Sequence, residues 1–295
     1  MTSGEWHSGH HTVDGSRRYW REWRPAAGRY LPVLALHGSL TQSGMWKAPA
    51  EAAGAIPMLC PDQRGFGLSD DPGADACAAF AADALSLAAE RLPGRFVVMG
   101  HSFACAIALE VARQASGRIA GVVLVDPVVR IPGAQPPSQP PAPAPAQPAA
   151  PVPESFATRE DAERHFRDTE EGLWPDAALR QFVTDIMMRD GDRKGDSGPW
   201  RFPYTAARLR RLRSFTASAG SDFGLFAKAK AVTGPVLAFR GGMSKRFAAA
   251  AEPAFVSAFA SPPEMVLCPD SGHFPSTTEP ALFIAALERF LAPLR

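Results

Sequence analysis

The sequence has almost no net charge, few cysteines and no long apolar run. Its 31 basic and 30 acidic side chains leave a formal net charge of +1, which favours neither nucleic acid nor a membrane surface as a partner. No apolar stretch approaches the roughly 18 residues that a transmembrane helix needs. The first residues, MTSGEWHSGHH, also lack the apolar core of a signal peptide. We therefore expect a cytoplasmic protein.

The four cysteines are scattered, and none forms a C-x-x-C pair. Cys60, Cys105 and Cys268 lie in apolar runs, where a buried free thiol is the usual state. The chain has 295 residues, of which 46% are hydrophobic. This content is enough for a sizeable core, and the length favours about two domains.

Apolar segments of strand length alternate with segments of helical length. The alternating segments are 31–36, 56–60, 74–91, 96–99, 104–111, 119–125, 235–239, 247–259, 264–268 and 279–291. A further pair of strands flanks the turn signal Asp14-Gly15. Strands that alternate with helices indicate an α/β protein whose parallel sheet is covered by helices on both faces.

The alternation stops near residue 130 and resumes near residue 232. We expect a core formed by residues 1–130 and 232–295, and an inserted, mainly helical domain formed by residues 131–231. The insertion opens with the proline-rich segment 132–153, which cannot form a helix or a central strand. A partner-docking motif is one interpretation of this segment, and a linker or hinge loop is the one we favour. The basic stretch RLRRLRSF (208–215) is expected to be a solvated helix face rather than a site for an anionic substrate.

The segment VVMGHSFACAIALEVA (97–112) places a serine between an apolar strand and an alanine-rich helix. The chain must reverse direction there within about four residues, which strains the central residue, Ser102. Gly100 and Ala104 are small, as the close approach of strand and helix requires. This pattern is the nucleophile elbow, G-x-S-x-G, with alanine in the last place. We predict that Ser102 is a nucleophile.

A serine hydroxyl needs a general base, and one histidine stands in the right place. His273, in CPDSGHFPS, follows the last predicted strand and precedes the last helix. It should therefore lie at the carboxyl ends of the strands, where open α/β sheets bind substrates. His37 is expected to hold a loop, and His101 to point away from the elbow. The other histidines lie in the insertion or in what we expect to be an N-terminal tail.

An oxyanion that develops on the substrate needs two backbone donors. The elbow supplies one of them, the N–H of Phe103. The segment LALHGSLTQSGMW (34–46) supplies the other, because Gly38 allows a tight turn directly after a strand. Ser39 or Leu40 is the second donor, and we prefer Ser39.

Four motifs carry a family resemblance: LHGS (36–39), DQRGFGLSD (62–70), GHSFA (100–104) and SGHFP (271–275). In this order and spacing they resemble the α/β-hydrolase superfamily, in the form that uses a serine nucleophile and inserts a cap after the sixth strand. The resemblance covers about residues 12–130 and 232–295. It implies a mostly parallel sheet of eight strands with helices on both faces, under a mainly helical lid.

The acid of the catalytic triad departs from the pattern of this family. Many members place it after the seventh strand, where this chain has Ser244. Some members place it at the end of the sixth strand, and Asp126 in VVLVDPV stands there. Glu252 could instead reach back from the next helix, or the acid could be absent. We favour Asp126, which would orient His273 and stabilise its imidazolium.

These residues predict a serine hydrolase that cleaves a small carboxylic ester or a related acyl compound, with no metal or organic cofactor. Thioester, lactone, amide and carbon–carbon bond hydrolysis and perhydrolysis use the same residues. The alternatives of another class are a non-catalytic ligand-binding protein on the same fold and a docking protein that uses the proline-rich segment. We expect a small acyl molecule as the partner, with Leu40, Trp174 and Phe182 as candidates for its pocket. The sequence carries no signal for an oligomeric state.

Overall fold

An eight-stranded sheet forms the centre of the molecule. The computed structural model describes residues 4–39, 41–73, 76–130, 153, 155–170, 172–189, 198–211 and 223–294. The strand order is β1-β2-β4-β3-β5-β6-β10-β11. The strands are β1 (Gly4–Val13), β2 (Ser16–Pro25), β3 (Val33–Leu36), β4 (Met58–Pro61), β5 (Phe96–His101), β6 (Ile119–Val125), β10 (Val236–Gly241) and β11 (Glu264–Cys268). The pairs β1–β2 and β2–β4 are antiparallel and all the others are parallel, which confirms the predicted sheet.

The first two strands form a long hairpin at one edge of the sheet. Asp14 and Gly15, at its tip, both have positive φ (50° and 74°), as the two central residues of a type I′ turn require. The expected N-terminal tail is wrong, because residues 4–13 pair with β2 along their whole length. His11, for example, is held against α2 (Cys77–Arg91) by Ser86 and Glu90.

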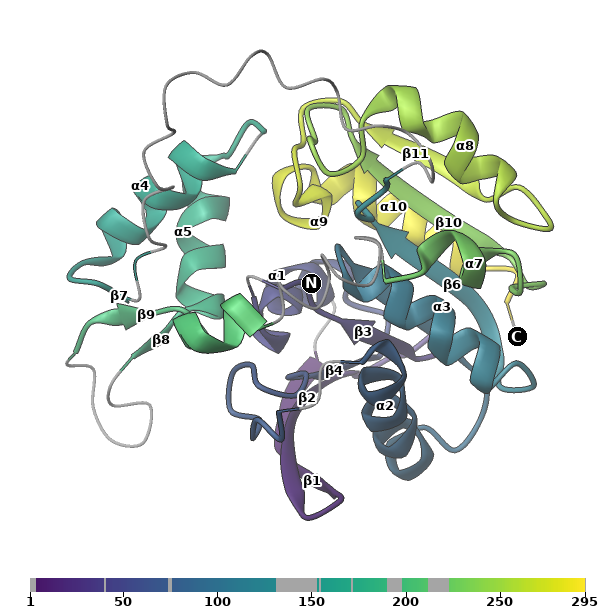
Figure 1. The fold of residues 1–295 in the computed structure, drawn as a ribbon, viewed down its shortest axis with the longest axis horizontal. Coiled ribbons are helices and arrows are strands. Elements are labelled where there is room, and N and C mark those ends of the chain that lie inside the picture. Colours follow the sequence, from purple (N-terminus) through teal and green to yellow (C-terminus); the bar gives the residue numbers. More distant parts are fainter. Residues whose placement is uncertain are drawn as a thin grey trace.

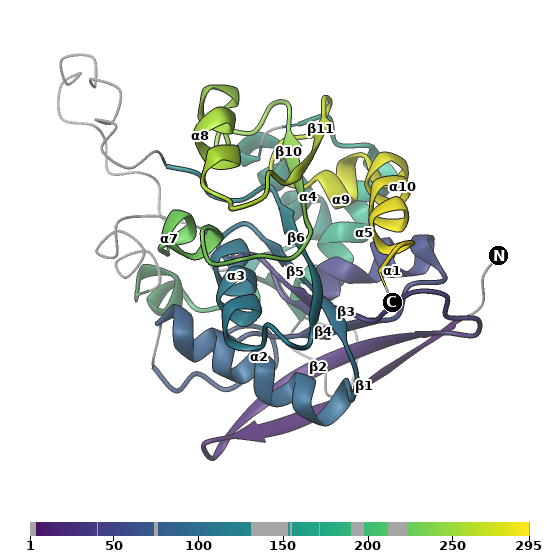
Figure 2. The same cartoon turned by 90° about the vertical axis from the view of Figure 1, so that its right-hand side faces the viewer.

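Helices cover both faces of the sheet, as predicted (Figure 2). The face with α2 also carries α3 (Ala104–Gln114), α7 (Leu225–Ala229) and α8 (Glu252–Ser257). The other face carries α1 (Lys47–Ala53) and α10 (Pro280–Leu291). Two short helical turns, η1 (Ser43–Trp46) and η2 (Ala249–Ala251), and the helix α9 (Pro275–Thr278) complete this part. Among the described residues, no helix has both the length and the apolar character needed to span a bilayer.

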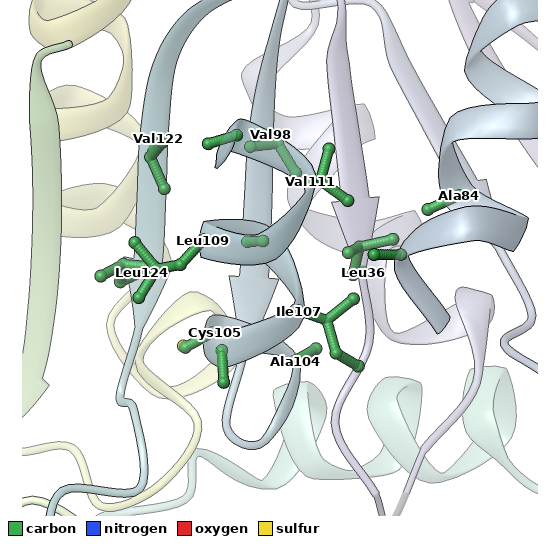
Figure 3. Close-up of a cluster of buried hydrophobic side chains, with 14 of the residues drawn as sticks. Leu36, Ala84, Val98, Ala104, Cys105, Ile107, Leu109, Val111, Val122 and Leu124 are labelled. Atoms are coloured by element: carbon green, nitrogen blue, oxygen red, sulfur yellow. The ribbon is translucent and has the colours of Figure 1, made fainter. Parts of the chain in front are cut away.

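The helix that follows Ser102 is buried between the sheet and its neighbours. Figure 3 shows side chains of β3, β5 and β6, such as Leu36, Val98 and Leu124, gathered around α3. Residues 104–112 are all buried, which explains why this helix consists almost entirely of small and apolar residues. The turn that carries Ser102 is therefore followed by a helix that is held on all sides by packed side chains.

Between β6 and β10, the described residues from 155 to 211 form a separate layer beside the sheet, whereas α7 packs on the sheet itself (Figure 1). This layer contains α4 (Arg159–Thr169), α5 (Asp176–Ile186) and a helical stretch at 206–211. It also contains a small sheet of β7 (Ser155–Phe156), β9 (Trp200–Arg201) and β8 (Met188–Arg189), which was not predicted. We call residues 155–211 the cap. Residues 131–152, nearly all of the proline-rich segment, lie outside the described residues, as does Leu40.

The prediction of a solvated face is wrong for Arg208. Its side chain is buried, and its guanidinium lies 5.0 Å from the ring centroid of Phe66 and 5.7 Å from that of Phe80. Its Nη2 also donates to the carbonyl of Arg64. A guanidinium stacks well on aromatic rings because it is planar and weakly hydrated. Arg211, one turn later, does face outward and pairs with Asp71.

Candidate active site

Ser102 stands at the tip of a strained turn between β5 and α3. Its φ is +59°, in the left-handed region that non-glycine residues avoid. The backbone N–H of Ser102 donates to the carbonyl of Val125 at 3.0 Å, which ties the turn to β6. Gly100 has no room for a side chain, because a Cβ there would lie 2.2 Å from the carbonyl oxygen of Ala104. The elbow predicted from the sequence is thus present, with its strain.

Three predicted residues meet in one hydrogen-bonded line. The Oγ of Ser102 lies 2.8 Å from Nε2 of His273, and Nδ1 of His273 lies 2.6 Å from Oδ2 of Asp126. All three side chains are buried. They come from the carboxyl ends of β5, β11 and β6, which lie close together at one edge of the sheet.

Asp126 is fixed by backbone and side-chain donors. It directly follows β6, and its N–H donates to the carbonyl of Phe239 on β10. Its Oδ1 accepts the N–H of Gly241 at 3.0 Å, and its Oδ2 accepts the hydroxyl of Ser244 at 2.6 Å. Burial raises the pKa of Asp126 to about 6, and the hydrogen bonds from Ser244 and Gly241 oppose that rise. These donors therefore favour the ionised carboxylate in a buried place.

The hydroxyl hydrogen of Ser244 can point in only one direction. Its oxygen accepts the backbone N–H groups of Arg246 and Phe247, so its hydrogen is left for Asp126. The other candidate acid is engaged elsewhere, because the carboxylate of Glu252 accepts Nε of Arg240 at 2.6 Å. The geometry therefore favours Asp126 over Glu252 as the carboxylate that orients His273.

The loop that carries His273 packs closely against the end of β10. A Cβ on Gly241 would lie 1.9 Å from the carbonyl oxygen of Gly272, so only glycine allows this approach. The N–H of Met243 donates to Ser271 in the same loop. Glu279 holds the other side of the loop by accepting from the N–H of Asp270 and the hydroxyl of Ser271. This packing places the imidazole between Ser102 and Asp126.

His101 lies beside His273, a role that the sequence interpretation missed. The two ring centroids are 4.7 Å apart, and Nε2–H of His101 donates to the carbonyl of His273 at 2.7 Å. Burial lowers the pKa of His101 to about 3, and the neighbouring His273 adds to that effect. His101 is therefore neutral, and it supports the backbone of His273. Its place on β5 indicates only that its side chain turns away from Ser102, and the contact with the His273 loop is seen in the structure alone.

The loop after β3, which we call the Gly38 loop (residues 37–39, 41 and 42), approaches Ser102. A Cβ on Gly38 would lie 3.3 Å from Cβ of Ser102. The carbonyl of Gly38 accepts hydrogen bonds from Nδ1–H of His37 and from the N–H of Thr41. The single hydroxyl proton of Thr41 lies between this carbonyl and Sδ of Met45. Because a trans peptide points its C=O and N–H in opposite directions, fixing this carbonyl also fixes the N–H of Ser39.

The imidazole of His37 has a defined tautomer. Its Nε2 accepts the N–H of Gln63 at 2.9 Å, so its proton is on Nδ1, where it reaches Gly38. Burial lowers the pKa of His37 to about 4, which keeps the ring neutral. The expected role of His37 in holding a loop fits these contacts.

Phe103, the other predicted oxyanion donor, is the N-cap residue of α3. Backbone N–H groups at the start of a helix have no acceptor within the helix. Its ring packs against Phe66, Phe80 and Phe223. This packing fixes the backbone at the position that follows Ser102.

The predicted pocket residues Trp174 and Phe182 belong to the cap and lie near the base. Their rings are 5.5 Å and 5.0 Å from that of Phe274, which is 5.3 Å from His273. Phe182 also lines a cavity of about 160 Å³ between α5, α1 and α9, together with Met45. The cap thus packs directly against the segment that carries His273.

Comparison with known proteins gives a consistent result. A model of the alpha/beta hydrolase family matches residues 33–286. The sequence is 31% identical to Lipase LipV of Mycobacterium tuberculosis over 103 residues, which are 35% of this chain and 40% of the lipase. This match thus spans well under two thirds of the lipase.

Solved structures resemble the chain along nearly its whole length. An alpha/beta hydrolase from Novosphingobium aromaticivorans has a TM-score of 0.70 at 24% identity and covers 98% of this chain and 99% of its own. An E-2-(acetamidomethylene)succinate hydrolase has a TM-score of 0.69 at 20% identity and covers 97% of this chain and 99% of its own. At these identities the likeness shows the fold alone.

Proposed function

Because the chain belongs to the alpha/beta hydrolase family, we propose that it is a serine hydrolase that cleaves a small carboxylic ester or a related acyl compound through an acyl-enzyme on Ser102. One observation carries the proposal. A single histidine, His273, is hydrogen-bonded through one ring nitrogen to Ser102 and through the other to the buried carboxylate of Asp126. This is the arrangement that turns a weak nucleophile into a strong one.

The proposed chemistry has two halves. Oγ of Ser102 attacks the acyl carbon while Nε2 of His273 takes the hydroxyl proton. The tetrahedral intermediate collapses, the bond to the leaving group breaks, and His273 returns the proton to that group. Water then attacks the acyl-enzyme with the same base, and the acid product leaves Ser102 with its proton restored. Asp126 accepts Nδ1–H throughout, which sets the tautomer and stabilises the imidazolium.

Two backbone donors would stabilise the negative oxygen of each intermediate. The N–H of Phe103 comes from the start of α3, and the N–H of Ser39 comes from the Gly38 loop beside Ser102. The donors on the Gly38 carbonyl, Nδ1–H of His37 and the N–H of Thr41, support this assignment, because they hold the peptide in place before the reaction begins. Such preorganised donors contribute the largest share of many rate accelerations.

The division into a core (1–130 and 232–295) and an inserted lid (131–231) is part of the same proposal. The packing of Trp174 and Phe182 on Phe274 supports a lid over the site. Phe274, on which both rings pack, directly follows His273, so the cap lies against the chain segment that carries the proposed base.

Hydrolysis of p-nitrophenyl acetate and butyrate tests the proposal. We expect turnover by the wild type and none by Ser102→Ala, together with a fluorophosphonate adduct on Ser102 that mass spectrometry detects. If wild type and Ser102→Ala hydrolyse both esters equally slowly and no adduct forms, the proposal is wrong. A non-catalytic ligand-binding protein would then be the better description.

A further inference from the structure

We propose that Gln42 is a positioning residue, which couples the seating of the cap helix α5 to the geometry of the Gly38 loop. The proposal rests on the proposed function, because the loop affects turnover only if Ser102 is the nucleophile. Gln42 lies three residues after Ser39, and its side chain is buried between the cap and the core. It contacts both, and each contact has a defined donor and acceptor.

On the cap side, the amide of Gln42 acts as a donor. Its Nε2 donates to the carbonyl of Asp185 at 2.8 Å and to that of Ile186 at 3.4 Å. Both carbonyls belong to the last turn of α5, where helices leave carbonyls without intrahelical partners. The helix end rests directly on the core backbone, because a Cβ on Gly44 would lie 1.9 Å from the carbonyl oxygen of Asp185.

On the core side, the same amide acts as an acceptor. Its Oε1 accepts the N–H of Gly44 at 2.7 Å and the hydroxyl of Ser43 at 3.3 Å. Gln42 is therefore the N-cap residue of η1. The residue before it, Thr41, gives its N–H to the carbonyl of Gly38.

These contacts form an unbroken path from the end of α5 to the second oxyanion donor. Movement of α5 pulls on Gln42, and Gln42 shares a backbone with Thr41, which fixes the Gly38 carbonyl. The N–H of Ser39 belongs to the same peptide group and turns with it. With the cap seated, this N–H keeps its direction beside Ser102. With the cap displaced, the donor turns away from the developing oxyanion.

Position 42 requires an amide because the cap side needs a hydrogen-bond donor and the core side needs an acceptor. The end of α5 offers carbonyl oxygens, which need a donor, and the start of η1 offers an N–H, which needs an acceptor. The neighbouring ion pair between Lys47 and Asp185, at 2.5 Å, also holds the end of α5 against the core. It reaches α5 from α1 and not from the Gly38 loop, which makes Lys47 a matched control.

The test is Gln42→Glu, with Lys47→Met as its control. Glutamate keeps the acceptor for Gly44 but turns a carboxylate oxygen, instead of an amide donor, toward two carbonyls. For p-nitrophenyl acetate at pH 8 we expect kcat to fall about 10- to 100-fold, with KM changed less than about threefold, because loss or misplacement of one donor acts on the transition state. Lys47→Met should keep kcat within about twofold.

The pH dependence separates positioning from a general loss of packing. The carboxyl group introduced by Gln42→Glu again donates a hydrogen bond to α5 once it is protonated, so the ratio of variant to wild-type kcat should rise as the pH falls. Circular dichroism and thermal unfolding check that both variants are folded. If Gln42→Glu does not fold, Gln42→Met, which removes donor and acceptor without adding charge, should show the same loss of kcat.

The remaining outcomes contradict the coupling. An unchanged kcat in a folded Gln42 variant overturns it, and so does an equal loss of kcat in Gln42→Glu and Lys47→Met. If the wild type shows no turnover that depends on Ser102, the proposed function fails and the coupling fails with it. Wild-type turnover that depends on Ser102, with an unaffected Gln42→Glu, removes the coupling alone.

Discussion

The hydroxyl of Ser244, in the loop after β10, donates a hydrogen bond of 2.6 Å to the carboxylate of Asp126, the residue that follows β6. Position 244 is where the sequence pattern leads one to look for the acid, and the structure places there a donor to the carboxylate that follows the adjacent strand. The ends of β6 and β10 are neighbours in a parallel sheet. Oδ2 of Asp126 therefore lies within hydrogen-bond distance of both the Ser244 hydroxyl and Nδ1 of His273.

Removing the charge of Asp126 should almost abolish turnover. In Asp126→Asn the amide no longer fixes the tautomer of His273 or stabilises its imidazolium, so we expect kcat to fall by a factor on the order of 10⁴. The matched control is Glu252→Gln, because Glu252 pairs with Arg240 and should leave kcat within about twofold. Steady-state hydrolysis of p-nitrophenyl acetate measures both, and a larger loss in the Glu252 variant would reverse the assignment of the acid.

A carboxylate at position 244, after β10, should partly replace the carboxylate of Asp126, after β6. Ser244 and His273 contact the same oxygen of Asp126, so a carboxylate at position 244 has a short path to Nδ1. We expect Ser244→Asp, added to Asp126→Asn, to recover at least about tenfold in kcat, out of the roughly 10⁴-fold loss. Ser244→Asn in the same background has the shape of aspartate without its charge, so we expect it to recover no kcat. Equal activity of the two double variants would show that position 244 does not reach the histidine.

Ser244 should also set the acidic limit of activity. The pKa of Asp126 is raised to about 6 by burial and held down by the hydrogen bond from Ser244. The active carboxylate is thus lost as the pH falls through about 6. Ser244→Ala removes the opposing hydrogen bond, so the pKa of Asp126 rises further and the acidic limb of kcat/KM moves to higher pH. Ser244→Thr keeps the hydroxyl and should keep the wild-type limb; a limb that stays in place in Ser244→Ala would contradict this account.

Gly100 should be required for stability as well as for activity. Its missing side chain lets α3 approach β5, and a Cβ would collide with the backbone at Ala104. We expect Gly100→Ala to lower the free energy of unfolding by about 3 kcal/mol or slightly more, at the upper end of overpacking costs. Gly117 has open space around it, so Gly117→Ala should change stability by less than about 1 kcal/mol. Urea unfolding followed by circular dichroism compares the two.

The sheet and the strained turn at Ser102 were predictable because they rest on local patterns. Apolar runs gave the positions of β4, β6 and β11 to within two residues, and the elbow depends on sequence neighbours such as Gly100. Other features depend on contacts between distant segments. The two-residue strands of the cap are too short to show alternation. The burial of Arg208 follows from two aromatic rings more than a hundred residues away.

The carboxylate that is hydrogen-bonded to His273 was the hardest residue of the site to predict. Asp126, Ser244 and Glu252 are all compatible with the same strand pattern, and only their hydrogen bonds distinguish them. His101 was missed for a related reason. Strand alternation shows that its side chain turns away from Ser102, but not that the loop with His273 has folded against that face.

The left-handed backbone at Ser102 serves the proposed reaction but lowers the stability of the fold. Among the described residues, only four non-glycine positions have positive φ, and two of them are Ser102 and Asp126. Such a conformation costs roughly 1–2 kcal/mol per residue, and glycine relieves it. A directed-evolution campaign that selects for heat tolerance alone would therefore favour glycine at position 102, and would lose the proposed reaction while it gains a few degrees of melting temperature.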